Sequence, residues 1–262
     1  MTRQRPGWLA PVALVAALLV AWEAYVRLAG VQPVVLPGPV RIADALWTFR
    51  GDAVRHAIPT VIETVLGFGL AVVLAVVAAA AMDRAQVVRR AVEPLLVTSQ
   101  TIPVVALAPL FLLWFGFGLA PKVLVVILVT FFPITVALLD GFRSARPEAE
   151  ELMRSYGATD SQAFRLLRWP TALPAFFIGL RISVVYAVIG AVFGEYVGAR
   201  EGLGIWMQLS QNAFRTDLVF AAIVVTSALS LLLYWLVGLA RRVVIPWAPG
   251  VRREPDLQER PF

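Results

Sequence analysis

The stretch that decides the fold class is Pro94–Pro121, PLLVTSQTIPVVALAPLFLLWFGFGLAP, which contains no charged residue. An α-helix needs about 20 predominantly apolar residues to cross the hydrocarbon core of a bilayer, and this run exceeds that length. The whole chain of 262 residues has the same bias: 60% of its residues are hydrophobic, 15% are charged, and the mean hydropathy is +0.79. Because so few charges cannot cover a soluble surface, we expect a polytopic membrane protein.

Further apolar stretches accompany this run, and together they predict six transmembrane helices in an all-α fold. In chain order, these other stretches are approximately Trp8–Leu28, Pro59–Met82, Val123–Leu139, Pro174–Val197 and Leu218–Ala240. The first has an alternative interpretation as a secretory signal, since Arg3 and Arg5 precede it. The lack of a clear A-x-A-like cleavage site and the later spans favour a membrane helix. Pro103 and Pro109 are expected to kink or break the third span.

Basic residues concentrate on one side of the predicted topology. With the N-terminus in the cytoplasm and six alternating helices, 16 of the 23 Lys and Arg residues fall in cytoplasmic segments. The positive-inside rule therefore predicts that residues 1–7 and the tail 243–262 are cytoplasmic and flank one transmembrane domain over 8–242. The net charge of +6 is then a topology signal, and no basic face on a folded domain supports nucleic-acid binding.

Rare residue types exclude several kinds of site. The chain has no cysteine, one histidine (His56) and one lysine (Lys122). Thiol chemistry, Cys-ligated metals and His clusters are therefore excluded, and we predict neither a metal site nor a catalytic centre. Lys122 follows Pro121 and precedes Val123, which does not match the G-x-x-x-x-G-K-[ST] sequence of a P-loop. If ATP drives this protein, another subunit must bind the ATP and its Mg²⁺.

The longest cytoplasmic connection, residues 141–173, predicts two short helices. Its sequence is GFRSARPEAEELMRSYGATDSQAFRLLRWPTAL. Pro147 suits the first turn of one helix, and Gly157 follows that helix as a C-terminal cap. Thr159–Gln162 has the form of a capping box and begins a second helix, which Pro170 is expected to end. One interpretation of this loop is a solvated helical hairpin that has no partner.

The same loop resembles the cytoplasmic signature E-A-A-x3-G-x9-I-x-L-P of the permease subunits of binding-protein-dependent ABC importers. Glu151, Gly157 and Pro170 match its Glu, Gly and Pro. Leu-Met stands in place of the two alanines, and Trp169 stands in place of the leucine. Outside the loop, TIPVVALAPLFLLWFGFG, FFPI, GLRI and GLG also resemble this family, so that nearly the whole chain is covered. The resemblance implies a type I ABC importer transmembrane domain with six helices.

The resemblance also implies partners and a role for the loop. In this family a coupling helix docks on a separate ATP-binding cassette ATPase, and an extracytoplasmic substrate-binding protein delivers the substrate. It therefore implies that the loop at 148–170 couples to the ATPase through Glu151, Arg154, Gly157, Phe164, Pro170 and Pro174. We expect the apolar docking face to comprise Tyr156, Ala163, Phe164 and Leu167. We also expect a homodimer of the permease in a bacterial inner membrane.

Polar residues within the spans are candidates for the substrate path. Glu195 lies in GAVFGEYVG and projects about 100° from a stripe of small residues that predicts close helix packing. That stripe comprises Gly190, Gly194 and Gly198. Glu195 either faces the path or lies at the outer interface, solvated or paired with Arg200. Gln100 and Thr101, before the first proline of the third span, are further candidates. Glu63, near a span end, is expected to reach the interface.

The substrate class rests on resemblance alone. VIGAVFGEYVGA, GLG and TDLVFAAI look most like permeases for thiamine-precursor pyrimidines, such as hydroxymethylpyrimidine. Permeases for riboflavin, or for sulfonate, taurine or nitrate, are alternatives in the same cluster. A neutral or weakly basic heterocycle suits an intramembrane Glu195 better than an anion does. Outside the family, the alternative is an ion-gradient-driven secondary transporter, which would need internal repeats and more intramembrane charge.

Overall fold

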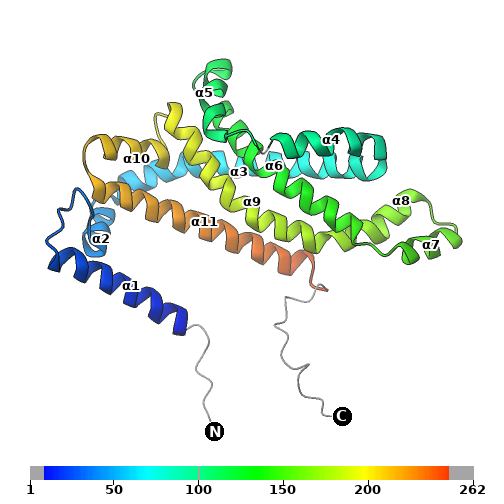
Figure 1. Ribbon diagram of the computed structural model, residues 1–262, viewed down its shortest axis with the longest axis horizontal. Coiled ribbons are helices and arrows are strands. Elements are labelled where there is room, and N and C mark those ends of the chain that lie inside the picture. The colour runs from blue at the N-terminus through cyan, green and yellow to red at the C-terminus, as the bar shows by residue number, and fades with distance from the viewer. Residues whose placement is uncertain (1–8, 100, 248–262) are drawn as a thin grey trace, which may run out of the picture. The chain divides into compact units, whose positions relative to one another are not determined.

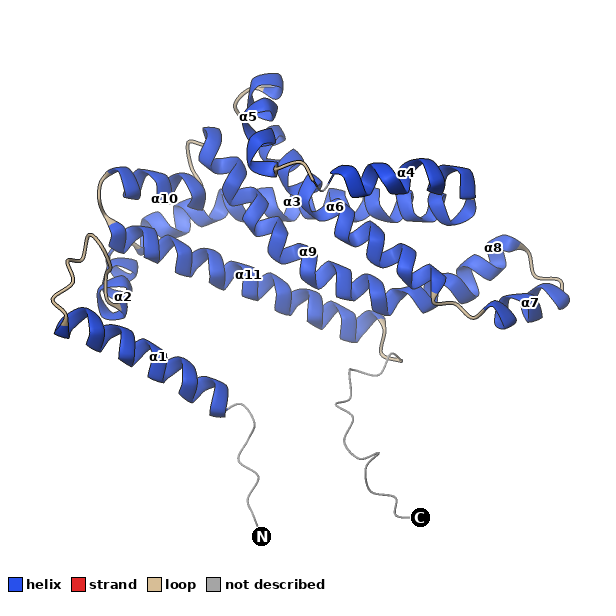
Figure 2. Ribbon diagram, in the orientation of Figure 1, coloured by secondary structure: helices blue, strands red, loops and turns tan. Residues whose placement is uncertain are grey.

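The computed structural model describes residues 9–99 and 101–247, and all regular elements within these ranges are helices (Figure 2). Eleven α-helices and one π-helical turn follow one another along the described chain (Figure 1). Their bounds are α1 Leu9–Leu28, α2 Pro39–Thr48, α3 Arg50–Arg84, α4 Gln86–Ser99, α5 Val104–Phe115, α6 Leu119–Arg143, α7 Pro147–Ser155, α8 Asp160–Ala163, the π-helical turn Phe164–Arg168, α9 Trp169–Gly198, α10 Leu203–Asn212 and α11 Thr216–Val244.

Five helical segments in the described ranges are long and apolar enough to cross a membrane. They are α1, α3, α6, the continuous segment Asp160–Gly198, and α11, and they coincide with five of the six predicted spans. The predicted third span is instead divided, because α4 ends at Ser99 and α5 begins only at Val104. Pro103 has no N–H to donate and disfavours a helical conformation in the residue before it, so the predicted break lies there. Pro109 remains inside α5.

The described residues divide into two compact units. Unit 1 gathers 9–67, Val104–Val126 and Val188–Ser230, and unit 2 gathers 68–99, 101–103, Ile127–Ala187 and 231–247. The long helices α3, α6, α9 and α11 contribute residues to both units.

The core of unit 1 forms around α10, a short helix that the sequence did not predict. Its buried apolar residues come from α2, α3, α10 and α11: Ala45, Ala53, Leu203, Trp206, Met207, Leu218, Ala221 and Ala222. The apolar residues within 40–49 predict a short amphipathic helix, and the structure confirms it as α2, which buries Ile42 and Ala45 and leaves Trp47 exposed. At ten residues, α10 is too short to stand out in a chain that is apolar nearly throughout.

The core of unit 2 depends on close approach between α6 and the first half of α9. A Cβ at Gly141 would lie 2.8 Å from the backbone Cα of Ala172, and a Cβ at Gly179 would lie 2.5 Å from the Cβ of Ala137. Small residues at such positions let helix backbones pack closely. Around this contact lie buried residues of α3, α4, α6 and α9 together with Ile245: Ala75, Ala79, Met82, Leu96, Ile134, Leu138, Leu139, Phe142, Ala172, Leu173, Phe176, Phe177 and Leu180.

Candidate functional site

The predicted cap at Gly157 is confirmed. Gly157 follows the C-cap Tyr156 with φ +81°, a left-handed conformation that glycine adopts without steric cost. Its N–H donates to the carbonyl of Arg154 at 2.9 Å, and the N–H of Ala158 donates to the carbonyl of Met153 at 3.0 Å. This pair of bonds is a Schellman motif, which satisfies the last carbonyls of α7 and turns the chain toward α8.

The predicted capping box at the start of α8 is also confirmed. The Thr159 hydroxyl accepts from the backbone N–H of Gln162 at 3.3 Å, and the Gln162 side-chain oxygen accepts from the backbone N–H of Thr159 at 2.8 Å. The two bonds satisfy donors that a helix start otherwise leaves free. The helical hairpin α7–α8 therefore has fixed ends on both sides of its turn.

The prediction that Pro170 ends the second helix is wrong. The helix that begins at Asp160 continues through Pro170 and Pro174 to Gly198. A π-helical turn precedes Pro170, and there the N–H of Trp169 donates to the carbonyl of Phe164. The Thr171 hydroxyl then donates to the Leu167 carbonyl at 2.7 Å. The wider turn accommodates the missing proline N–H, so α8 is physically continuous with α9.

Arg168 ties the hairpin to the end of α3. Its Nε donates to Glu150 Oε2 at 3.0 Å, a second nitrogen donates to Oε1 of the same carboxylate, and Nη1 donates to Asp83 Oδ2 at 2.9 Å. The three side chains are largely buried, and a two-pronged arginine–carboxylate contact is both stronger and more directional than a single one. Hydrogen bonding from Arg168 holds the pKa of the Glu150 carboxyl below its ordinary value.

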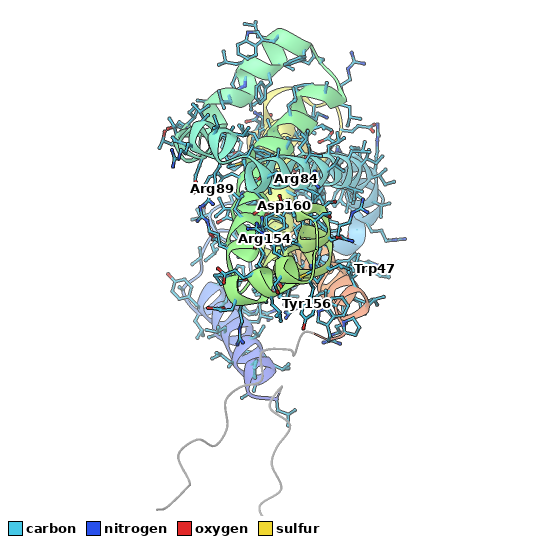
Figure 3. The ribbon with its side chains drawn as sticks, turned by 90° about the vertical axis from the view of Figure 1, so that its right-hand side faces the viewer. Trp47, Arg84, Arg89, Arg154, Tyr156 and Asp160 are labelled. Carbon is cyan, nitrogen blue, oxygen red and sulfur yellow. The ribbon has the colours of Figure 1, made fainter. Side chains whose placement is uncertain are left out.

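Arg154 contacts the same cluster of Arg168, Glu150 and Asp83 from its exposed side. It donates to Glu150 Oε1 at 2.9 Å and to Asp160 Oδ1 at 3.3 Å, which links α7 to the start of α8. Since Arg154 and Asp160 are both largely exposed, we expect these pairs to contribute little free energy. Figure 3 labels Arg84, Arg154 and Asp160 at this end of unit 2. These three residues, together with Asp83, Ser161, Phe164 and Arg168, line a cavity of about 540 Å³.

Of the four residues expected to form an apolar docking face, only Tyr156 is fully exposed. Phe164 points inward, with its ring centroid 5.4 Å from Phe142 and 6.3 Å from Trp169, and Ala163 is buried. The apolar side chains that reach the surface of the hairpin are instead Leu152, Tyr156 and Leu166, exposed by 57%, 85% and 69%. Phe164 therefore packs into the base of the hairpin, and the three exposed residues form its apolar surface.

The signature residue Glu151 is exposed, in contrast to its neighbour Glu150. Successive residues of a helix point about 100° apart, so only one of two adjacent acids on α7 can face Arg168. The assignment of the signature Glu to position 151 thus places an exposed carboxylate beside Leu152 on the surface of the hairpin. Glu150, which the sequence did not indicate as a site residue, makes the internal contacts to Arg168 and Arg154.

In unit 1, Glu195 is fully buried, and the outer-interface alternative for it is wrong. Its Oε1 accepts from the Thr60 hydroxyl at 2.6 Å, and its Oε2 accepts from the backbone N–H of Gly204 at 2.6 Å. The Glu195 carboxylate is therefore neither exposed to solvent nor hydrogen-bonded to Arg200 among the described residues. Because both carboxylate oxygens already accept a hydrogen bond, Glu195 holds elements of the protein together in this conformation.

The elements that Glu195 joins meet at the start of α10. The backbone N–H groups of three consecutive residues there donate to side chains. That of Gly202 donates to His56 Nδ1 at 3.1 Å, that of Leu203 to the Thr60 hydroxyl at 3.0 Å, and that of Gly204 to Glu195 Oε2. Helix starts carry N–H groups without a partner inside the helix, and side chains of α3 and α9 satisfy them here.

Two glycines allow this close approach. Gly202 has φ +143°, and a Cβ there would overlap the Glu195 carboxyl group. A Cβ at Gly204 would overlap the carbonyl oxygen of Val192. The GLG sequence at 202–204, which resembles the family, is therefore explained by packing, because its glycines let the start of α10 approach Glu195 and the backbone of α9.

Glu63 is also buried, and the prediction that it reaches the interface is wrong. Its Oε1 accepts from Lys122 Nζ at 2.5 Å, and both side chains are nearly inaccessible to solvent. A buried charge needs a partner, and Lys122 lies 59 positions along the chain. One sequence signal could have located this cluster: His56, Thr60 and Glu63 recur at i, i+4 and i+7, on one face of α3.

The remaining predicted residues lie apart from this cluster or at its edge. A Cβ at Gly194 would lie 3.0 Å from Lys122 Cα, and one at Gly198 would lie 2.8 Å from a methyl carbon of Leu112. Gly190 is buried as well. Thr101 is exposed in the turn between α4 and α5, where its hydroxyl donates to the Thr98 carbonyl at 2.7 Å. Gln100 lies outside the described residues.

The chain is similar to known transport proteins over most of its length. A family model described as binding-protein-dependent transport system inner membrane component matches residues 67–245. The chain is 41% identical over 240 residues to the formylaminopyrimidine transport permease protein ThiX of Halalkalibacterium halodurans, covering 91% of this chain and 96% of that protein. It is 38% identical over 249 residues to the riboflavin transport system permease protein RibX of Chloroflexus aurantiacus, covering 93% and 92%.

A solved structure has the same fold. A chain of the inward-facing MetNI methionine ABC transporter superposes with a TM-score of 0.60 at 20% sequence identity, covering 77% of this chain and 98% of that chain. The predicted all-α transmembrane fold of an ABC importer is thereby confirmed, with the third span divided into α4 and α5.

A first prediction concerns Arg168. Arg168→Gln removes the contacts to Glu150 and Asp83, so we expect faster hydrogen exchange of the α7 amides, measured by mass spectrometry at pH 7. The pKa of Glu150 is lowered in the folded wild-type protein, so the Glu150 carboxylate stabilises the hairpin above about pH 4.5. This stabilisation is lost as the pH falls further, and it is absent from Arg168→Gln at every pH. Arg165→Gln, at an exposed arginine with the same charge loss, is the control. Equal exchange in the two variants would contradict the role of Arg168.

A second prediction concerns Glu195. In Glu195→Gln the amide cannot accept from both Thr60 and Gly204, and an unsatisfied buried donor costs roughly 1–3 kcal/mol. We expect a melting temperature lowered by several degrees in detergent, and a similar loss in Thr60→Val. Glu201→Gln, which loses only an exposed pair with Arg55, should melt as wild type does. A Glu195→Gln variant with wild-type stability but a raised KM for uptake would instead place Glu195 in the substrate path.

Proposed function

The chain belongs to the family of binding-protein-dependent transport system inner membrane components, and from this premise we propose that it imports a thiamine-precursor pyrimidine. As a permease of an ABC importer it is a multi-pass protein of the inner membrane, and its relatives are transport components. Family membership leaves the ion-gradient-driven alternative without support.

The hairpin α7–α8 is the element through which we propose that this chain contacts its ATPase. Its surface presents apolar side chains, Leu152, Tyr156 and Leu166, beside the exposed carboxylate of Glu151. An exposed apolar group rimmed by charge is typical of a protein-binding surface. Beneath that surface, Arg168 and Phe164 hold the hairpin to α3 and α6. This combination of an exposed contact face and a fixed base supports coupling.

The proposed assembly contains a homodimer of this chain, two copies of an ATP-binding cassette ATPase and an extracytoplasmic substrate-binding protein. ATP and Mg²⁺ bind to the ATPase, since this chain has no P-loop sequence. Both termini are proposed to lie in the cytoplasm, on the side of the hairpin. Closure of the ATPase pair would move the hairpins and shift the permease between outward-open and inward-open states.

The proposed substrate class rests on the identity of 41% to a formylaminopyrimidine permease over nearly the whole of both chains. The riboflavin permease follows at 38%, so riboflavin is the second candidate, with sulfonate, taurine or nitrate behind it. Glu195 does not discriminate among them, because both of its oxygens are bonded internally. We therefore propose that the separate binding protein selects the substrate and that the permease path interacts with it weakly.

The coupling proposal predicts the effect of Gly157→Trp. Among the described residues, no atom beyond the chain neighbours of Gly157 lies within 4 Å of a Cβ at this position, so an indole would project from the hairpin surface toward the ATPase. We expect loss of ATPase co-purification and of ATP-dependent uptake, with membrane insertion intact. Gly157→Asn should retain both, since asparagine tolerates φ > 0.

A matched control separates docking from backbone strain. Gly30 also has positive φ, +62°, and open space around a Cβ. Gly30→Trp introduces the same side chain with similar strain outside the hairpin, and the ATPase should still co-purify. The coupling proposal fails if Gly157→Trp retains the ATPase, or if both tryptophan variants lose it.

The substrate proposal is tested by ligand binding to the cognate binding protein and by uptake. We expect that binding protein to bind an aminopyrimidine more tightly than riboflavin or taurine, measured by calorimetry. Proteoliposomes with the complete transporter should accumulate labelled aminopyrimidine only when ATP is enclosed with the ATPase. Preferred binding of riboflavin or taurine would overturn the pyrimidine assignment and leave the family assignment intact.

A further inference from the structure

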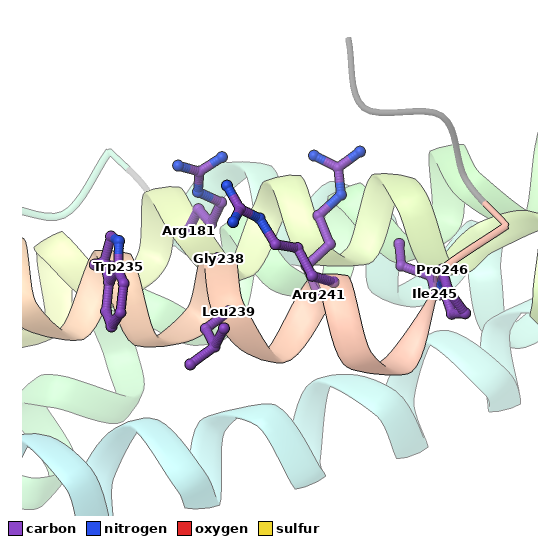
Figure 4. A pocket seen from close by; sticks show the side chains of 8 residues that line it. Arg181, Trp235, Gly238, Leu239, Arg241, Ile245 and Pro246 are labelled. Atoms are coloured by element: carbon purple, nitrogen blue, oxygen red, sulfur yellow. The ribbon is translucent and has the colours of Figure 1, made fainter. Parts of the chain in front are cut away.

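A cavity of about 410 Å³ lies in unit 2, between the C-terminal part of α11 and the middle of α9. It is within the range of sizes that small ligands occupy in proteins. Its lining is basic and aromatic: Arg181, Trp235, Gly238, Leu239, Arg241, Arg242, Ile245 and Pro246. Nothing in the proposed coupling or translocation functions uses these residues. Figure 4 shows Arg181 and Arg241 with their side chains on the same side of α11.

Arg181 is held in place by contacts that leave its hydrogen-bonding capacity unused. Its guanidinium lies over the ring of Tyr234, 4.1 Å from the centroid, which is a cation–π contact. The Nε atom is buried and has no hydrogen-bond partner among the described residues. A buried donor without an acceptor is costly, and its N–H groups are suited to a charged oxygen ligand.

Gly238 leaves room beside that guanidinium. A Cβ at this position would lie 3.7 Å from Arg181 Nε and 3.8 Å from its central carbon, which is ordinary van der Waals contact. A larger side chain would enter the space in front of the guanidinium. The cavity therefore owes its volume in part to this glycine.

Positive charge in the cavity is not neutralised by the described protein. Arg181, Arg241 and Arg242 form no ion pair with any carboxylate in residues 9–99 and 101–247. Three arginines around one cavity favour an anion with several acceptor oxygens, and arginine matches the geometry of a phosphate particularly well. The expected ligand chemistry is a phosphate group.

The surroundings indicate the source of that phosphate. On α11 the residues before Arg241 are exposed and apolar, as expected of a lipid-facing surface: Leu231, Leu232, Trp235, Leu236 and Leu239. The arginines follow directly, so the cavity lies where the apolar surface ends. Trp and Tyr are typical of this level of a membrane, and basic pockets between helices there bind anionic lipid headgroups.

We propose that this cavity binds the headgroup phosphate of an anionic phospholipid, with Arg181, Arg241 and Arg242 around the phosphate and the acyl chains along α11. This site is separate from the coupling hairpin and does not depend on the identity of the transported substrate.

The test is native mass spectrometry of the purified, delipidated chain titrated with phosphatidylglycerol or phosphatidylcholine of identical acyl chains. We expect tighter binding of phosphatidylglycerol to wild type. Arg181→Gln and Arg241→Gln should each weaken it roughly fivefold. Arg200→Gln, at an exposed arginine outside the cavity, is the control for loss of charge and should bind as wild type does. Gly238→Leu keeps every charge and fills the cavity, so it should also weaken binding.

Three results would overturn the proposal. The first is equal binding of the two lipids to wild type, and the second is equal loss in Arg181→Gln, Arg241→Gln and Arg200→Gln. The third comes from a competition arm with inorganic phosphate: displacement of phosphatidylglycerol at millimolar phosphate would assign the cavity to a soluble anion. Melting temperatures of all variants identify a misfolded protein, and Arg241→Gln, at a partly exposed position, tests the site if Gly238→Leu does not fold.

Discussion

A carboxylate inside an apolar helical bundle must obtain its hydrogen bonds from the protein, because lipid offers none. Unit 1 is organised by this constraint at Glu195. Its two oxygens bind Thr60 on α3 and the start of α10, so one side chain of α9 fixes the positions of two other elements. The glycines at 202 and 204 follow from it, since any side chain there would occupy the space of that carboxylate or of the α9 backbone.

Unit 2 meets a related constraint with an arginine. Arg168 lies where the π-helical turn passes into α9, and it binds carboxylates of α7 and α3 at once. Arg168 and Arg154 together balance the charges of Glu150 and Asp83, which permits partial burial at this junction. In both units a single charged residue satisfies groups from several elements, and it does so in a chain that is only 15% charged. Glu195 and Arg168 thus each connect several helices.

The sequence predicted helices and caps that depend on neighbouring residues. It did not predict the contacts of charged side chains whose partners lie far along the chain. Five spans, α2, the Gly157 cap and the Thr159 capping box follow from composition and short-range spacing. The distance from a span end predicts an interfacial position for Glu63 and leaves two positions open for Glu195, because the sequence does not reveal their partners, Lys122 and the N–H groups of α10. The continuation of the helix through Pro170 required a π-helical turn, which has no simple sequence signature.

The continuous helix from Asp160 to Gly198 determines how the proposed coupling hairpin would transmit movement. A hairpin joined to the next span by a flexible loop could be displaced without moving that span. Here α8 passes into α9 without a break, and Arg168 binds the hairpin to the end of α3. A force on the exposed residues of α7 must therefore act on α3 and α9 together or break the Arg168 contacts. Exposed Glu151 and internally bonded Glu150 fit the proposed coupling role, because Glu150 holds the base of the hairpin and leaves Glu151 available to a partner.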